Sequence, residues 1–202
     1  MHTLTGFVDY IKANVDALEL KNHVIVVENP GEASLYSAIT GRDRKRDLVA
    51  VAALDKGLQS YRFGQYQQVE EFVISLNSLF EESMDREKVI NYVSRVKGGT
   101  GFTLDDDGVT QVAEVSRGVS GALTEKESAP KIVGLKPYRT FRDIDQPVSN
   151  FLMRLKLIDT ESHIVGVCLY EADGGRWRDT VVQTIKEFLN KELADLGVAI
   201  IA

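Results

Sequence analysis

Cysteine, histidine and long apolar runs are all scarce in this chain of 202 residues. The single cysteine, Cys168, excludes an intrachain disulfide and a zinc site built from several cysteines, and it indicates a reducing, cytoplasmic environment. No stretch approaches the roughly 18 apolar residues that a membrane-spanning helix needs. The first residues also lack the basic region and apolar core of a signal peptide. We therefore expect a soluble protein that is not exported and has no membrane partner.

The composition is that of a folded globular protein. Hydrophobic residues make up 44% of the chain and charged residues 27%, enough to bury a core. The net charge of −6 argues against nucleic-acid binding by bulk electrostatics, although a local basic patch can still bind phosphate groups.

The stretch from Lys131 to Leu189 has the clearest pattern in the chain. It predicts three strands joined by turns, then a tight turn at EADGG and a helix, and the first strand is expected over KIVGLKPYRTF. Alternation in the second strand predicts an antiparallel strand with one buried face, formed by Phe151, Met153, Leu155 and Leu157. In the helix, a three- and four-residue spacing predicts a stripe that packs on a sheet: Trp177, Val181, Ile185, Phe188 and Leu189.

The rest of the chain also mixes helices and strands. We expect a helix capped by Thr5, a strand meander at 23–28, 34–40 and 48–54, helices at 65–82 and from Asp85 to Gly98, and a short strand at 100–104. Residues 109–127 fit both a helix and a strand, because Gly118 and Gly121 weaken both.

Together these patterns predict an α+β protein, with mainly antiparallel sheets packed by amphipathic helices. At this length, residues 1–202 suit a single domain. The polar, proline-ended segment 124–130 is the best candidate for a linker, and it would separate an N-terminal meander and helical part from a C-terminal hairpin and helix part.

No motif of an enzyme or a metal site stands out. GGTG at 98–101 lacks the spacing and the lysine of a phosphate-binding loop, and DDDG at 105–108 lacks the glutamate that completes a calcium loop. Three histidines, His2, His23 and His163, are scattered along the chain without the spacing of a metal site. Cys168 lies in an apolar run, which is typical of a small buried hydrophobic residue. We therefore predict no catalytic residue, no metal and no cofactor, while enzymatic activity stays open.

One pair of carboxylates gives a weaker alternative. Asp143 and Asp145 lie two residues apart and would suit a metal-assisted hydrolase if both faced a cleft. The surrounding RDIDQP is equally typical of a turn before a strand, in which Asp143 pairs with a nearby arginine.

Two groups of cations are candidates for binding a nucleotide or a nucleic acid. The first lies in a loop between two predicted strands and contains Arg42, Arg44, Lys45 and Arg46. Because Asp43 and Asp47 offset part of its charge, a solvated connection is the alternative. The second group is Arg139 and Arg142, interleaved with Tyr138 and Phe141.

The order of these patterns resembles the YfdQ-like family of prophage and phage proteins, a group of unknown function. The resemblance rests on LTGFVDYIKAN, the strand, NPG and strand after it, VEEFVISLNSLFE, and KPYRTFRDIDQPVSNFLMRLKL leading into RWRDTVVQTIKEFL. It implies a phage or prophage source and an early-expressed accessory role, and it supplies no catalytic residues.

The leading hypothesis is thus a non-enzymatic phage accessory protein that self-associates in the cytoplasm of a bacterial host. Amphipathic faces and apparently exposed aromatics motivate it, with Tyr138, Phe141, Phe151 and Trp177 as possible interface residues. An ordinary core role is the alternative for such aromatics. The rival hypothesis is a nucleotide- or nucleic-acid-binding module, with counter-defence against the host as one role, that uses the basic loop at 42–46 together with Arg139 or Arg142.

Overall fold

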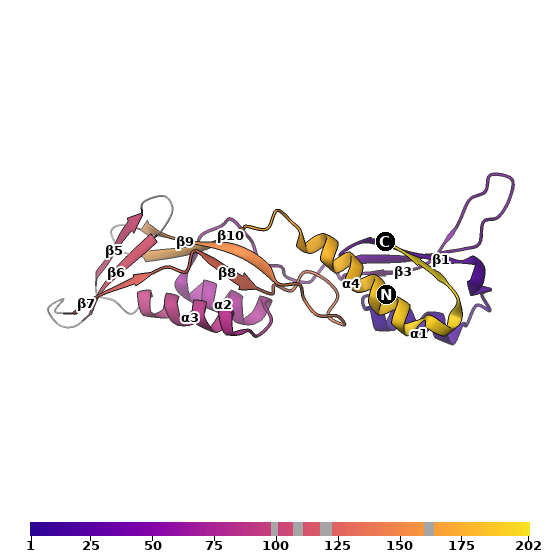
Figure 1. Ribbon diagram of the computed structural model, residues 1–202, viewed down its shortest axis with the longest axis horizontal. Helices are drawn as coiled ribbons and strands as arrows, with labels where there is room; N and C mark the ends of the chain where they lie inside the picture. Colours follow the sequence, from indigo (N-terminus) through magenta and orange to yellow (C-terminus); the bar gives the residue numbers. More distant parts are fainter. Residues whose placement is uncertain (98–100, 107–110, 118–122, 160–163) are drawn as a thin grey trace. The chain divides into compact units, whose positions relative to one another are not determined.

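A computed structural model describes the chain except for residues 98–100, 107–110, 118–122 and 160–163 (Figure 1). The chain forms two compact units, each assembled from separate segments. Unit 1 contains Met1–Gln59, Tyr138–Pro147 and Arg176–Ala202, and unit 2 contains Ser60–Pro137 and Val148–Gly175. Each unit combines helices with a mostly antiparallel sheet, so the predicted α+β class is confirmed.

Unit 1 is built on a four-stranded sheet in the order β11-β1-β2-β3. Its strands are β1 (Val24–Asn29), β2 (Glu32–Tyr36), β3 (Leu48–Ala53) and β11 (Ala199–Ile201). The first three form the predicted antiparallel meander, whereas β11 returns from the end of the chain to pair with β1 in parallel.

Two helices cover one face of this sheet (Figure 1). They are α1 (Leu4–Ala13) and α4 (Trp177–Glu192), whose C-terminal turns are joined by a 2.9 Å ion pair between Lys12 and Glu192. The sheet presents Ile25, Leu35 and Ala52 to the helices, and these residues are fully buried. Short 3₁₀ turns, η1 (Leu20–Asn22) and η2 (Ala194–Leu196), precede β1 and β11.

Unit 2 repeats this two-layer plan with different connections. Its sheet has the order β4-β10-β9-β8, formed by β4 (Gln67–Gln68), β10 (Ile164–Glu171), β9 (Ser149–Asp159) and β8 (Ile132–Leu135). Helices α2 (Val69–Leu79) and α3 (Met84–Lys97) lie on one face of β8–β10 (Figure 1). The sequence predicts that one face of the strand now identified as β9 is buried. This is confirmed for Phe151, Met153 and Leu155, while Leu157 is partly buried against the same core.

A third, antiparallel sheet in unit 2 has the order β5-β6-β7. It consists of β5 (Gly101–Asp106), β6 (Gln111–Arg117) and β7 (Leu123–Ser128). In the described part of 109–127, the choice between helix and strand is therefore settled in favour of strands. Most of the proposed linker at 124–130 belongs to β7 and lies inside unit 2. The number of independently folding domains stays a prediction.

Several predicted boundaries are wrong for local reasons. The helix expected at 65–82 is shorter, because Gln67 and Gln68 pair with β10 before α2 begins. Helix α1 is capped by Thr3, whose Oγ1 accepts a hydrogen bond from Gly6 N, and it ends where Asn14 adopts a left-handed conformation. The expected first strand of the 131–189 stretch ends at Leu135, so PYRTF lies in a loop.

None of the helices in the described parts of the chain combines the length and the apolar character needed to cross a lipid bilayer.

Candidate functional site

The loop 138–147 is held in unit 1 by a buried glutamine. Gln146 is 2% exposed, and its Oε1 accepts hydrogen bonds from Arg139 N at 3.1 Å and Thr140 N at 3.3 Å. Its Nε2 donates to Phe141 O and Ile144 O at 3.0 and 3.3 Å. One side chain therefore organises the whole loop, with Phe141 and Ile144 inserted into the core of unit 1.

Asp143 joins this loop to the start of α1. Its Oδ2 accepts a hydrogen bond from Leu4 N at 3.0 Å, and its Oδ1 accepts from Thr5 Oγ1 at 2.7 Å and Thr5 N at 3.4 Å. A carboxylate at this position satisfies free N–H groups of the first turn and interacts favourably with the helix dipole. This geometry supports a structural role for Asp143 and differs from the arginine pairing considered from the sequence. Its neighbour Asp145 is exposed.

The two arginines of this loop stack on aromatic rings. The guanidinium carbon of Arg139 lies 3.8 Å from the ring centre of Trp177, and that of Arg142 lies 3.8 Å from the ring centre of Tyr138. Arg178 also approaches Trp177, at 5.1 Å. Each of these two stacks joins an arginine to a ring of the same unit, where such contacts stabilise the loop.

The basic loop lies in a different part of unit 1. It belongs to the connection between β2 and β3, in which Thr40 and Lys45 form an isolated bridge and all four predicted cations are exposed. Arg46 donates from Nη1 to the carbonyl oxygens of Asn22 and Ser37, so it anchors the base of the connection.

The two predicted groups of cations do not form one site. Tyr36 pairs with Val24 and with Leu48, which places the connection between β2 and β3 at one end of the sheet. At the other end, the hydroxyl of Thr140 donates to the carbonyl oxygen of Pro30 in the β1–β2 turn. The two ends are about 20 Å apart, because β1 has six residues with a rise of about 3.3 Å each.

The second face of the unit 1 sheet was not recognised from the sequence. We call it outer face 1; strand alternation and register assign to it Val24, Val26, Glu28, Glu32, Ser34, Tyr36, Leu48, Val51, Ala53, Ala199 and Ile201. Leu48 is 57% exposed and Ile201 is 51% exposed. A sheet that exposes contiguous aliphatic side chains is a candidate binding surface.

Outer face 1 has ends of opposite charge. The basic connection between β2 and β3 borders Tyr36 and Leu48, whereas Glu28 and Glu32 lie at the opposite ends of their strands. Tyr36 crosses part of the face, and its hydroxyl donates to Glu28 at 2.9 Å. This hydrogen bond raises the pKa of Tyr36 above its usual value.

The second face of the β4–β10–β9–β8 sheet, outer face 2, is also partly apolar. Ile132, Leu152 and Tyr170 are direct neighbours in the register of β8, β9 and β10, and Ile132 is 57% exposed. By contrast, three of the predicted interface aromatics are buried within their own units: Phe141, Phe151 and Trp177. Burial favours the core alternative for these three, and Tyr138 is half-buried against Arg142.

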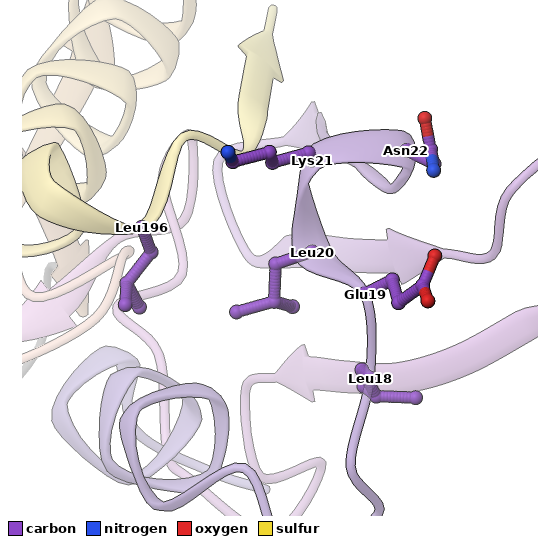
Figure 2. Close-up of a pocket in the computed structure, with 6 residues that line it drawn as sticks. All are labelled: Leu18, Glu19, Leu20, Lys21, Asn22 and Leu196. Atoms are coloured by element: carbon purple, nitrogen blue, oxygen red, sulfur yellow. The ribbon is translucent and has the colours of Figure 1, made fainter.

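A pocket of about 380 Å³ lies in unit 1 beside η1 and is lined by Leu18, Glu19, Leu20, Lys21, Asn22 and Leu196. Figure 2 shows Leu20 and Leu196 directed toward the same space, with Glu19 and Asn22 pointing away from it. The volume suits a small ligand. Leu20 and Leu196 are aliphatic and offer no group for proton transfer or metal binding, whereas Lys21 contributes an amine to the lining.

The remaining candidate residues have structural environments. His23 is buried with its Nδ1 at 2.9 Å from Glu19 O, and His2 Nδ1 lies 3.2 Å from Ala53 O, whereas His163 is outside the described residues. Cys168 is fully buried, which raises the pKa of its thiol. Across the described ranges, no three histidine, cysteine, aspartate or glutamate side chains gather as a metal site would require.

The chain matches no protein-family model, no curated protein and no solved structure. The resemblance to the YfdQ-like family therefore stays a prediction.

Proposed function

We propose that this protein is a non-enzymatic phage or prophage accessory protein that acts in the bacterial cytoplasm as a homo-oligomer. The supporting observation is the one-sided cover of two sheets: helices pack on one face of each, while large apolar side chains remain exposed on the other. Leu48, Ile201 and Ile132 are each more than half exposed. Burying such surfaces against other copies is the simplest way to remove them from water.

A catalytic role has less support than self-association, because three of the candidate catalytic side chains are buried or held by backbone groups. Asp143, the best placed of the candidate acids, is occupied by the first turn of α1. Cys168 is fully buried, and His23 is held against a backbone carbonyl.

Self-association is tested by light scattering coupled to size-exclusion chromatography. Loading concentrations from about 1 to about 200 µM cover the affinities expected for interfaces of modest size. We expect the weight-average mass to rise from the chain mass of 22.4 kDa toward a multiple of it. A mass that stays at 22.4 kDa over the whole range would exclude the proposal.

A second candidate function is the binding of a nucleotide or a nucleic acid by the basic connection between β2 and β3. The observation that favours it is the exposure of Arg42, Arg44 and Lys45, for which no ion pair is found within the described segments. Exposed cations at a loop tip can approach phosphate groups without losing an internal partner.

The test is fluorescence anisotropy with a labelled oligonucleotide, using protein purified without nuclease. Wild-type binding is expected to weaken as the salt concentration rises, and replacing Arg42, Arg44 and Lys45 by alanine is expected to abolish it. The matched control removes the same charge from exposed lysines elsewhere: Lys21, Lys56 and Lys191. Equal loss in both variants would show only a general charge effect, and binding that survives the loop substitutions would refute this function.

A further inference from the structure

We propose that outer face 1 is a two-fold interface, in which two copies pack sheet against sheet with the basic end of each over the acidic end of the other. The inference rests on the proposed self-association and adds to it the surface, the partner and the orientation. The partner is a second copy of this chain.

The centre of outer face 1 is suited to face-to-face packing. Val26 pairs with Ser34 on β2 and with Ile201 on β11, and Ser34 pairs with Val51 on β3, so aliphatic side chains surround a small residue. Ser34 is only 2% exposed, so a partner would cover little additional polar surface there. Sheets that carry such side chains pack about 10 Å apart, with their strands nearly aligned.

Charge determines the orientation. A two-fold axis that lies in the plane of the face and runs across the strands exchanges the two ends of the sheet. Each copy's Arg42 and Lys45 then approach Glu28 and Glu32 of the other copy, and both contacts form at once because the interface is symmetric. An axis along the strands would place like charges together, which is unfavourable.

The area predicts a weak dimer. Four strands about 4.8 Å apart, with β1 about 20 Å long, present about 400 Å² from each copy. The total of about 800 Å² is below that of a standard stable interface, so we expect dissociation in the micromolar range. The equilibrium is therefore measurable by sedimentation of the full chain.

The experiment introduces a charge at an exposed position of outer face 1, where the folded monomer tolerates it. Leu48→Glu and Ile201→Glu are each expected to weaken dimerisation at least about 100-fold. An unpaired charge would be buried, and Leu48 lies at the end of the face that meets Glu32 of the other copy. The matched control is Ile132→Glu on outer face 2, since Ile132 and Leu48 have the same exposure of 57%. Circular dichroism verifies that all three variants fold.

Charge reversal tests the orientation. Glu28→Lys with Glu32→Lys should weaken the dimer about tenfold at low salt, and Arg42→Glu with Lys45→Glu should do the same. A chain with all four changes has its charged ends exchanged, so its dimer should recover. The same chain would still fail to bind an oligonucleotide, which separates this role of the cations from phosphate binding.

Each result has a distinct meaning. A wild-type chain that is monomeric throughout would refute the proposed function and this inference together. An oligomer that survives both Leu48→Glu and Ile201→Glu, or that is lost only in Ile132→Glu, would leave self-association intact but exclude outer face 1. If the dimer does not recover in the variant that carries all four charge reversals, the proposed orientation is wrong.

Discussion

Removing the Asp143 carboxylate is expected to destabilise unit 1 through the start of α1. In the structure this side chain accepts hydrogen bonds from Leu4 N at 3.0 Å and from Thr5 Oγ1 at 2.7 Å. Loss of a capping side chain costs about 1 to 2 kcal/mol, and loss of its charge at the helix terminus adds about 0.5 kcal/mol. We therefore expect Asp143→Ala to lower the free energy of unfolding by about 2 kcal/mol.

Asp143→Asn separates the charge from the hydrogen bonds, because the amide keeps one acceptor oxygen. We expect it to cost about 1 kcal/mol, roughly half the effect of alanine. For a chain of 202 residues, 2 kcal/mol corresponds to a fall in Tm of about 6 °C. Urea unfolding followed by circular dichroism measures both variants.

The control for this prediction is Asp145→Asn, because Asp145 is exposed two residues away. Its effect should stay within about 0.5 kcal/mol. If Asp143→Ala were no more destabilising than this control, the capping argument would be wrong. Asp143 would then be available again as a candidate for chemistry.

Three further predictions concern buried groups. Gln146→Leu should cost about 3 kcal/mol in urea unfolding, since four backbone groups of the 138–147 loop lose their partner; a cost below about 1 kcal/mol would contradict this. Gly166→Ala should destabilise unit 2 by about 1 to 2 kcal/mol, because an added Cβ would lie 2.6 Å from Ile158 Cγ2, and Ile158→Ala should restore part of the loss if that contact is the cause. Burial raises the pKa of Tyr61, so its contribution to stability is complete below the unfolded value of about 10 and is lost as the pH rises above it. Tyr61→Phe should thus reduce the alkaline loss of stability by up to about 1.4 kcal/mol per pH unit above pH 10, and an unchanged slope would count against this reasoning.

Local elements were predictable where one periodicity dominates. The alternation of Phe151, Met153 and Leu155 fixes which face of β9 is buried, and Trp177, Val181 and Ile185 likewise fix the buried stripe of α4. Boundaries failed where a longer-range contact overrides the local pattern. Gln67 and Gln68, for example, have a helical context in the sequence but pair with β10, about a hundred residues away.

Loop 138–147 was harder to predict, because its partners are distant in sequence. Arg142 and Asp143 are adjacent and suggest a local ion pair, yet Asp143 binds α1 and Arg142 stacks on Tyr138. The pairing of β11 with β1 was also hard to predict, because the paired residues lie about 175 positions apart in the sequence. Because the chain crosses between units at several points, a division at a single polar segment could not describe it.

Outer face 1, in contrast, was indicated by the sequence of β1, which is apolar on both sides of the strand and so does not show simple alternation of apolar and polar residues. Both Ile25 and Val27, which face the helices, and Val24 and Val26, which face away, are aliphatic. Strands that are apolar on both sides are typical of sheets covered on both faces. In unit 1 the described helices cover only one of them, although burying the other would remove aliphatic surface from water at about 25 cal/mol for each Å². The mismatch between a sequence suited to two covered faces and a unit that covers one is the physical reason to expect a partner there.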